Sequence, residues 1–169
     1  MGVHLSRFLL DKGYKVIALD RSSSTAPDID NKIKFIHGDI KNKNMMISAL
    51  KNVDYVVHAA AALPIIRTKT EIFKTNVDGT KNVLEGALRN NVKRVVFISS
   101  SEVYGIPKVL PEKENNPLDP IGPYGESKIE AERLCFSYLR RGLSINILRP
   151  KTFLGKGRLG VFTLWFEAI

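Results

Sequence analysis

Residues 93–105, KRVVFISSSEVYG, give the clearest indication of the fold. Their first half contains a short apolar run, which is typical of a strand buried on both faces of a parallel sheet. Ser99, Ser100 and Ser101 follow it directly. Because ligands bind outside the carboxyl ends of strands in open α/β sheets, we expect a hydroxyl here to meet a substrate oxygen. The alternative is that the serines only cap the strand and begin a turn.

The rest of the chain alternates between similar apolar runs and amphipathic stretches, which is the pattern of βαβ units. The expected strands cover residues 14–20, 33–37, 54–58, 93–99 and 143–148. The expected helices cover residues 3–12, 42–51, 67–90 and 124–141, with a loop over 105–122. Parallel strands need crossover connections, and these are right-handed. The sequence therefore predicts an α/β fold, a Rossmann-like doubly wound parallel sheet, forming one domain over residues 1–169.

The start of the chain departs from this pattern. A doubly wound dinucleotide fold begins with a strand that leads into a glycine-rich turn, whereas this chain begins at the helix that follows such a turn. Met1 and Gly2 stand where the turn would end. The first strand would lie between the strands at 14–20 and 54–58. We therefore expect a partial domain that lacks the first strand and the C-terminal substrate region; the alternative is a complete small protein with a rearranged sheet.

Composition narrows the class of protein. The chain is 44% hydrophobic and 25% charged, as in globular proteins, and no apolar run approaches the ~20 residues that span a bilayer. The net charge of +9 comes from scattered side chains, so we expect no nucleic-acid and no membrane partner. Cys135 is the only cysteine, which excludes an internal disulfide and favours a reducing, cytoplasmic location. We expect no metal site.

Tyr124 and Lys128 are the clearest catalytic candidates. They are four residues apart in the expected helix 124–141 and so share one face of it. A lysine ammonium beside a phenol favours the phenolate, which can exchange protons with a substrate hydroxyl. The pair alone occurs often by chance, and its alternative is two surface residues on one helix face. The serines after the strand at 93–99 make the catalytic interpretation stronger.

Several segments together resemble the extended short-chain dehydrogenase/reductase family, which includes NAD-dependent sugar-nucleotide epimerases, dehydratases and decarboxylases. The two central ones are FISSSEVYG at 97–105 and PYGESKIEAE at 123–132. The others, in order, are ALDR at 18–21, HGDI at 37–40, VVHAAA at 56–61, KTNVDGTKNVLEGA at 74–87 and LRPKTFLGKG at 148–157. The resemblance covers nearly all of residues 2–157. It implies a Rossmann-fold enzyme that uses a nicotinamide dinucleotide.

The resemblance assigns roles to individual residues. The catalytic set is Ser100, Tyr124 and Lys128, with Asn76 bracing the site. The cofactor-binding set is Gly2, Asp20, Arg21, Asp39, Ile40, Ala59, Ala60, Ala61, Tyr124 and Lys128. Asp20 ends a strand, where a carboxylate can accept both ribose hydroxyls and so favours NAD. Arg21 could accommodate a 2′-phosphate, so NADP is not excluded.

The subclass follows from Ser100, Ser101 and Glu102. Dehydratases of the family usually have Thr-Asp-Glu here, so the missing aspartate argues against 4,6-dehydration. The sequence favours an epimerase acting by transient hydride transfer on a nucleotide sugar. A hydroxysteroid-dehydrogenase-like reductase comes next, then a decarboxylase or dehydratase. A non-catalytic dinucleotide-binding relative and an inactive fragment remain as rivals. Relatives commonly form homodimers through helices like 67–90 and 124–141. Since only Gly2 remains of the glycine turn, we expect the chain alone to bind NAD weakly or not at all.

Overall fold

The strands form two parallel sheets whose order matches the predicted fold. The computed structural model describes residues 1–22, 27–63 and 68–153. One sheet pairs β1 (Ile17–Asp20) with β2 (Lys34–His37). The other has the order β3 (Tyr55–His58), β4 (Arg94–Ile98), β5 (Ile145–Leu148). All pairs are parallel, so the predicted strands and their parallel arrangement are confirmed.

β1 and β3 do not belong to the same sheet. They are the strands between which the sequence predicts a missing central strand. The strands are also shorter than predicted, most clearly β1, which begins at Ile17 rather than residue 14. Gly13 (φ +80°) ends the preceding helix with two bonds, from Gly13 N to Leu10 O and from Tyr14 N to Leu9 O. This turn and the short approach to the strand occupy residues 12–16.

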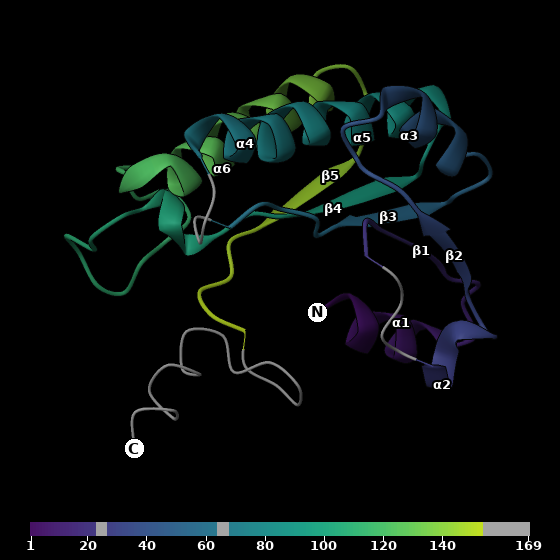
Figure 1. The fold of residues 1–169 in the computed structure, drawn as a ribbon. Coiled ribbons are helices and arrows are strands. Elements are labelled where there is room, and N and C mark those ends of the chain that lie inside the picture. Colours follow the sequence, from purple (N-terminus) through teal and green to yellow (C-terminus); the bar gives the residue numbers. More distant parts are fainter. Residues whose placement is uncertain (23–26, 64–67, 154–169) are drawn as a thin grey trace.

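Helices cover both faces, as a doubly wound fold requires (Figure 1). On one side lie α1 (Gly2–Asp11) and α2 (Pro27–Asp30). On the other lie α3 (Lys43–Ala49), α4 (Lys69–Phe73), α5 (Gly79–Arg89) and α6 (Gly122–Leu139). In the part of the chain that the structure describes, no helix is long and apolar enough to cross a membrane.

The core lies between the β3–β4–β5 sheet and the helices α5 and α6. Alternate strand residues, such as Val95, Phe97 and Ile145, point toward these helices and are buried, as the two-residue period of a strand requires. They pack with residues of α5 and α6, including Leu84, Ala87, Ala131 and Cys135. α6 is therefore held firmly against the middle of this sheet.

The helix predicted at 67–90 is not a regular α-helix throughout. A π-helical segment, η1 (Lys74–Asp78), separates α4 from α5, and residue 67 lies outside the described part. Thr68 caps α4, and Glu71 completes a capping box with it. The wider π turn places Asn76 in the interior, at 1% exposure. Such turns are often found at functional sites.

Candidate functional site

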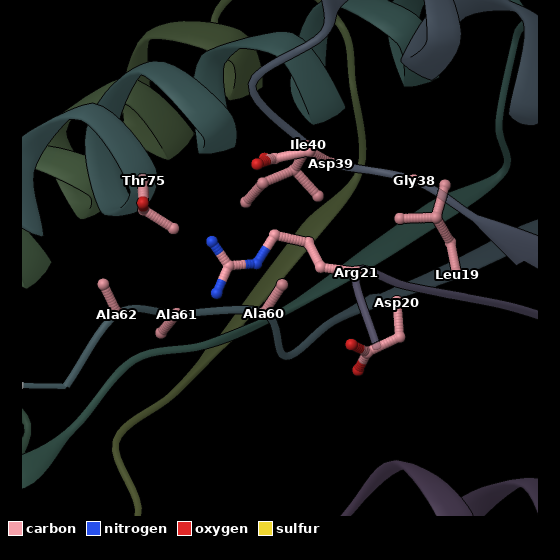
Figure 2. A pocket seen from close by; sticks show the side chains of 10 residues that line it. All are labelled: Leu19, Asp20, Arg21, Gly38, Asp39, Ile40, Ala60, Ala61, Ala62 and Thr75. Atoms are coloured by element: carbon pink, nitrogen blue, oxygen red, sulfur yellow. The ribbon is translucent and has the colours of Figure 1, made fainter. Parts of the chain in front are cut away.

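A pocket lies where β1 and β2 end and the chain leaves β3 (Figure 2). Its lining residues are Leu19, Asp20, Arg21, Gly38, Asp39, Ile40, Ala60, Ala61, Ala62 and Thr75. Six of the predicted cofactor-binding residues are thus brought together from three segments far apart in the sequence. The position agrees with the rule that open α/β sheets bind ligands at the carboxyl ends of their strands.

The loops that carry the two pocket carboxylates are held by local hydrogen bonds. The Asp20 carboxylate accepts a bond from Ser22 N at 2.9 Å, and that of Asp39 accepts one from Lys41 N at 2.9 Å. The carbonyl of Ile40 accepts a bond from the Asn82 amide of α5 at 3.0 Å. The turn after β2 is therefore fixed to a helix of the core.

Arg21 and Thr75 shape the pocket from opposite sides. Figure 2 shows the Arg21 side chain extended across the pocket toward Thr75 and the alanine turn, while the Asp20 side chain, at the edge of the pocket, points in a different direction from Arg21. Thr75 is not among the residues that the sequence predicts for the site. In the sequence, only the position of Thr75 next to Asn76 could have suggested a role for it. In a regular helix the Thr75 side chain would point in a different direction from the one that it takes in the π turn.

The remaining predicted residues do not line this pocket. Gly2 begins α1, and Ala59 is exposed just after β3. Asn76, Ser100, Tyr124 and Lys128 lie instead in a second group, where η1, the end of β4 and the start of α6 meet.

Asn76 joins two parts of the second group. Its amide oxygen accepts a bond from Ala62 N at 2.7 Å, and its amide nitrogen donates to Ala62 O at 3.1 Å and to Ser127 Oγ at 2.9 Å. Ser127 in turn donates to the carbonyl of Tyr124 at 2.7 Å. Asn76 therefore ties the pocket wall to the turn of α6 that carries Tyr124. The sequence did not predict a role for Ser127, because a serine within a helix is common and gives no sign of such a contact.

Lys128 is buried, with 3% of its surface exposed. Its ammonium donates to the carbonyl of Ile98 at 2.8 Å and lies 5.9 Å from the ring centre of Tyr124. Burial lowers the pKa of Lys128 to about 8, while interactions with Cys135 and then Glu132 oppose this effect. At neutral pH Lys128 is still a cation, and it is close to a phenol.

Ser100 lies at the start of the short 3-10 helix η2 (Ser101–Val103), and its hydroxyl accepts a bond from Glu102 N at 3.2 Å. α6 approaches this segment closely at Gly125, because a Cβ atom there would lie 2.6 Å from Glu102 O. Glycine next to Tyr124 thus permits the start of α6 to sit against the segment that follows Ser100.

His58 is a structural residue of this region. It is 4% exposed, and its Nε2 is 2.9 Å from Thr80 Oγ1. Since Thr80 already donates its proton to Asn76 O at 2.6 Å, His58 Nε2 is the donor to Thr80. Burial first, and then the charge of Lys128, lower the pKa of His58 to about 3, so the ring is neutral.

Comparison with known proteins decides the family. The model of the NAD dependent epimerase/dehydratase family matches residues 1–167. The chain belongs to this family. It is 33% identical, over 79% of its length, to the UDP-glucose 4-epimerase of Halalkalibacterium halodurans, of which it covers 42%.

Solved structures of the family agree with the fold. The UDP-glucose 4-epimerase of Thermotoga maritima, solved with UDP-glucose, superposes with a TM-score of 0.87 at 30% identity, over 98% of this chain and 58% of that one. The dTDP-glucose 4,6-dehydratase DesIV of Streptomyces venezuelae, solved with NAD, gives 0.79 at 33% identity, over 88% and 51%. The chain spans about half the length of such relatives.

Proposed function

We propose that this chain supplies the NAD-binding pocket and the proton-transfer residues of a sugar-nucleotide epimerase. The observation that carries the proposal is the pairing of two sites. One is a pocket with Asp20 at a strand end. The other is a buried Lys128 beside Tyr124, next to the Ser100 segment.

The pocket residues fit the adenosine part of a dinucleotide. A carboxylate at the end of β1 can accept ribose hydroxyls, and the alanine turn leaves room for the ligand to approach the backbone. Asp39 and Ile40 would contact the adenine. Relatives solved with NAD support this cofactor. When bound, NAD would supply the site with a hydride acceptor and donor.

The second group would handle the proton and the oxygen. Tyr124, as phenolate, would take the proton from a sugar hydroxyl, and Lys128 would stabilise that phenolate by its positive charge. The Ser100 hydroxyl would donate a hydrogen bond to the substrate oxygen as its charge changes. Ser101, next to Ser100, has no carboxylate to act as a general acid, which favours epimerisation over 4,6-dehydration.

A chimera tests this proposal. Residues 1–150 would replace the matching part of the Thermotoga maritima epimerase, and interconversion of UDP-glucose and UDP-galactose would be followed by NMR. We expect turnover, and Tyr124→Phe should lower kcat by about 100-fold or more, while bound NAD is retained. Tyr138→Phe, the same change further along α6, should leave turnover nearly intact, since the Tyr138 hydroxyl bonds to Glu85 at 3.0 Å and not to any of the proposed proton-transfer residues.

Two results would contradict the proposal. A folded chimera that holds NAD but has no turnover would favour a non-catalytic dinucleotide-binding relative. Turnover that survives Tyr124→Phe would remove Tyr124 as the acid/base.

A further inference from the structure

The carboxylate of Glu132 lies in the interior at the end of β4 and is only 1% exposed. Ser99 Oγ donates to it at 2.5 Å. Arg149, just after β5, donates from Nε at 2.9 Å and from Nη2 at 2.6 Å, forming a two-pronged ion pair. None of these three residues contributes to the pocket or to the proposed proton transfer, so their burial needs another explanation.

Arg149 extends the network to the segment that follows Ser100. Its Nη1 donates to the Tyr104 hydroxyl at 2.7 Å and to the carbonyl of Glu114 at 3.0 Å. The backbone adds bonds from Ser99 N to Leu148 O at 2.7 Å and from Ser101 N to Pro150 O at 3.0 Å. Ser100 therefore lies between residues that are fixed on both sides.

α6 is fixed to the same strand end by successive turns. Tyr124, Lys128 and Glu132 are four residues apart and share one face of the helix. Lys128 bonds to the carbonyl of Ile98, and Glu132 bonds to the next residue, Ser99. Two adjacent turns of α6 thus bond to two adjacent residues at the strand end. These bonds fix both the rotation of the helix about its axis and its position along that axis.

We propose that Glu132 is a positioning residue that holds Tyr124 and Lys128 against the Ser100 segment and supplies the carboxylate that stabilises the Lys128 ammonium. The inference rests on the proposed function, because it assumes that Tyr124, Lys128 and Ser100 act together. Arg149 compensates the buried charge of Glu132 and keeps it from being expelled.

The groups around Lys128 leave Glu132 as its counter-charge. His58, from β3, is neutral because burial holds its pKa at about 3. Cys135, one turn beyond Glu132, stays protonated because burial raises its pKa to about 12. Phe97, from β4, places its ring 4.9 Å from the Lys128 ammonium. Tyr124, from α6, is the proposed partner in catalysis. Glu132 lies one turn further along the same face of α6, and its carboxylate is paired with the Arg149 cation.

A pH titration of Lys128 in the purified chain tests the proposal. Lysine labelled with ¹³C at Cε reports the ammonium by NMR, and nuclear Overhauser effects report its contact with the Tyr124 ring. In Glu132→Gln we expect the Lys128 pKa to fall by about one pH unit and the contact to weaken. Glu132→Asp should restore the titration in large part, because it keeps the charge.

The controls separate positioning from simple stabilisation. Glu130→Gln makes the same change on the exposed side of α6, where Glu130 pairs with Arg133, and should move neither signal. If Glu132→Gln does not fold, the paired variant Glu132→Gln with Arg149→Met removes both charges and should fold. It should show a smaller fall in the Lys128 pKa, because the Arg149 cation is removed with the carboxylate, and a weakened contact between Lys128 and Tyr124.

An unchanged Lys128 titration and an unchanged Tyr124 contact in these variants would overturn the proposal and leave a purely structural ion pair. The readout needs no dinucleotide, so this failure is distinct from a failure of the proposed function. Loss of turnover in the Tyr124→Phe chimera, combined with an unchanged titration here, would uphold the function and reject the role of Glu132.

Discussion

At the scale of single residues, His58 shows what burial beside a cation does to a titratable group. The ring is held neutral between β3 and the helices, with a pKa of about 3 against 6.5 for an exposed histidine. In the unfolded chain it binds a proton below pH 6.5, whereas in the folded chain it does so only near pH 3. Folding stability at this residue is therefore lost as the pH falls from 6.5 toward 3.

We predict that His58→Gln reduces this loss. Glutamine has no titration and can still donate to Thr80 Oγ1. Relative to the native chain, the variant should gain on the order of several kcal/mol between pH 6.5 and 3. Urea unfolding at a series of pH values measures the unfolding free energy of both proteins. The carboxylates contribute equally to both, so their effect cancels in the difference. Parallel pH curves for both proteins would show that His58 is protonated or exposed in the folded state.

Asp20 and Arg21 lead to opposite expectations for the cofactor. In the proposed site the Asp20 carboxylate would accept ribose hydroxyls and repel a 2′-phosphate, so we predict that NAD binds more tightly than NADP. Asp20→Ala should remove the preference, and Arg21→Ala should weaken NADP more than NAD. Titrations of each variant with both dinucleotides measure this. Tighter binding of NADP by the native chain would mean that Arg21, which crosses the pocket, dominates.

The resemblance to the family supplied most of the pocket residues. Asp20 was also expected from its place at the end of a strand, whereas Asp39 and Ala60 were expected only from the matching segments. Thr75 and Ser127 could not be found in this way. Their roles depend on the direction of helix side chains across the π turn and on a partner, Asn76, 51 residues from Ser127.

At the scale of elements, the π turn η1 places Asn76 where its side chain connects two other segments. Asn76 satisfies both backbone groups of Ala62 and also reaches α6. We predict that Asn76→Ala costs about 2–4 kcal/mol of unfolding free energy, because it leaves the Ala62 N–H and C=O without this partner. Denaturant unfolding provides the measurement.

Asn44→Ala, an exposed change at the start of α3, is the matched control and should alter stability by less than about 0.5 kcal/mol. Equal effects of the two variants would mean that Asn76 contributes no more than a surface amide.

The order of the helices and strands was predicted correctly, but their first and last residues were predicted less exactly. Apolar runs identify strands because burial on both faces leaves few polar residues. The ends depend on caps and turns, such as Gly13, that shorten the strand beside them. The helix at 67–90 was predicted as one piece, because the apolar pattern on either side of η1 is helical and one added residue in a turn barely changes it.

At the scale of the whole molecule, the two sheets are joined around the pocket rather than through a common strand. β1 and β2 carry Asp20 and Asp39, while β3 leads into the alanine turn. Ile17 on β1 and Val57 on β3 are 41% and 40% exposed, which is high for strand residues of a parallel sheet. The pocket proposed for the adenosine part of the cofactor lies between these segments, but Gly2 at the start of α1 is not part of its wall.

The most direct test is an NMR titration of the purified, ¹⁵N-labelled chain with NAD. The dinucleotide would contact the adenosine side of the pocket, while Gly2, at the start of α1, is not among the residues that line it. We predict weak binding, with a Kd above about 100 μM, and shifts confined to residues 19–21, 38–40, 60–62 and 75. Asp20→Ala should weaken it further. Shifts that leave these residues out, or no shifts at several millimolar NAD, would contradict the assignment of this pocket.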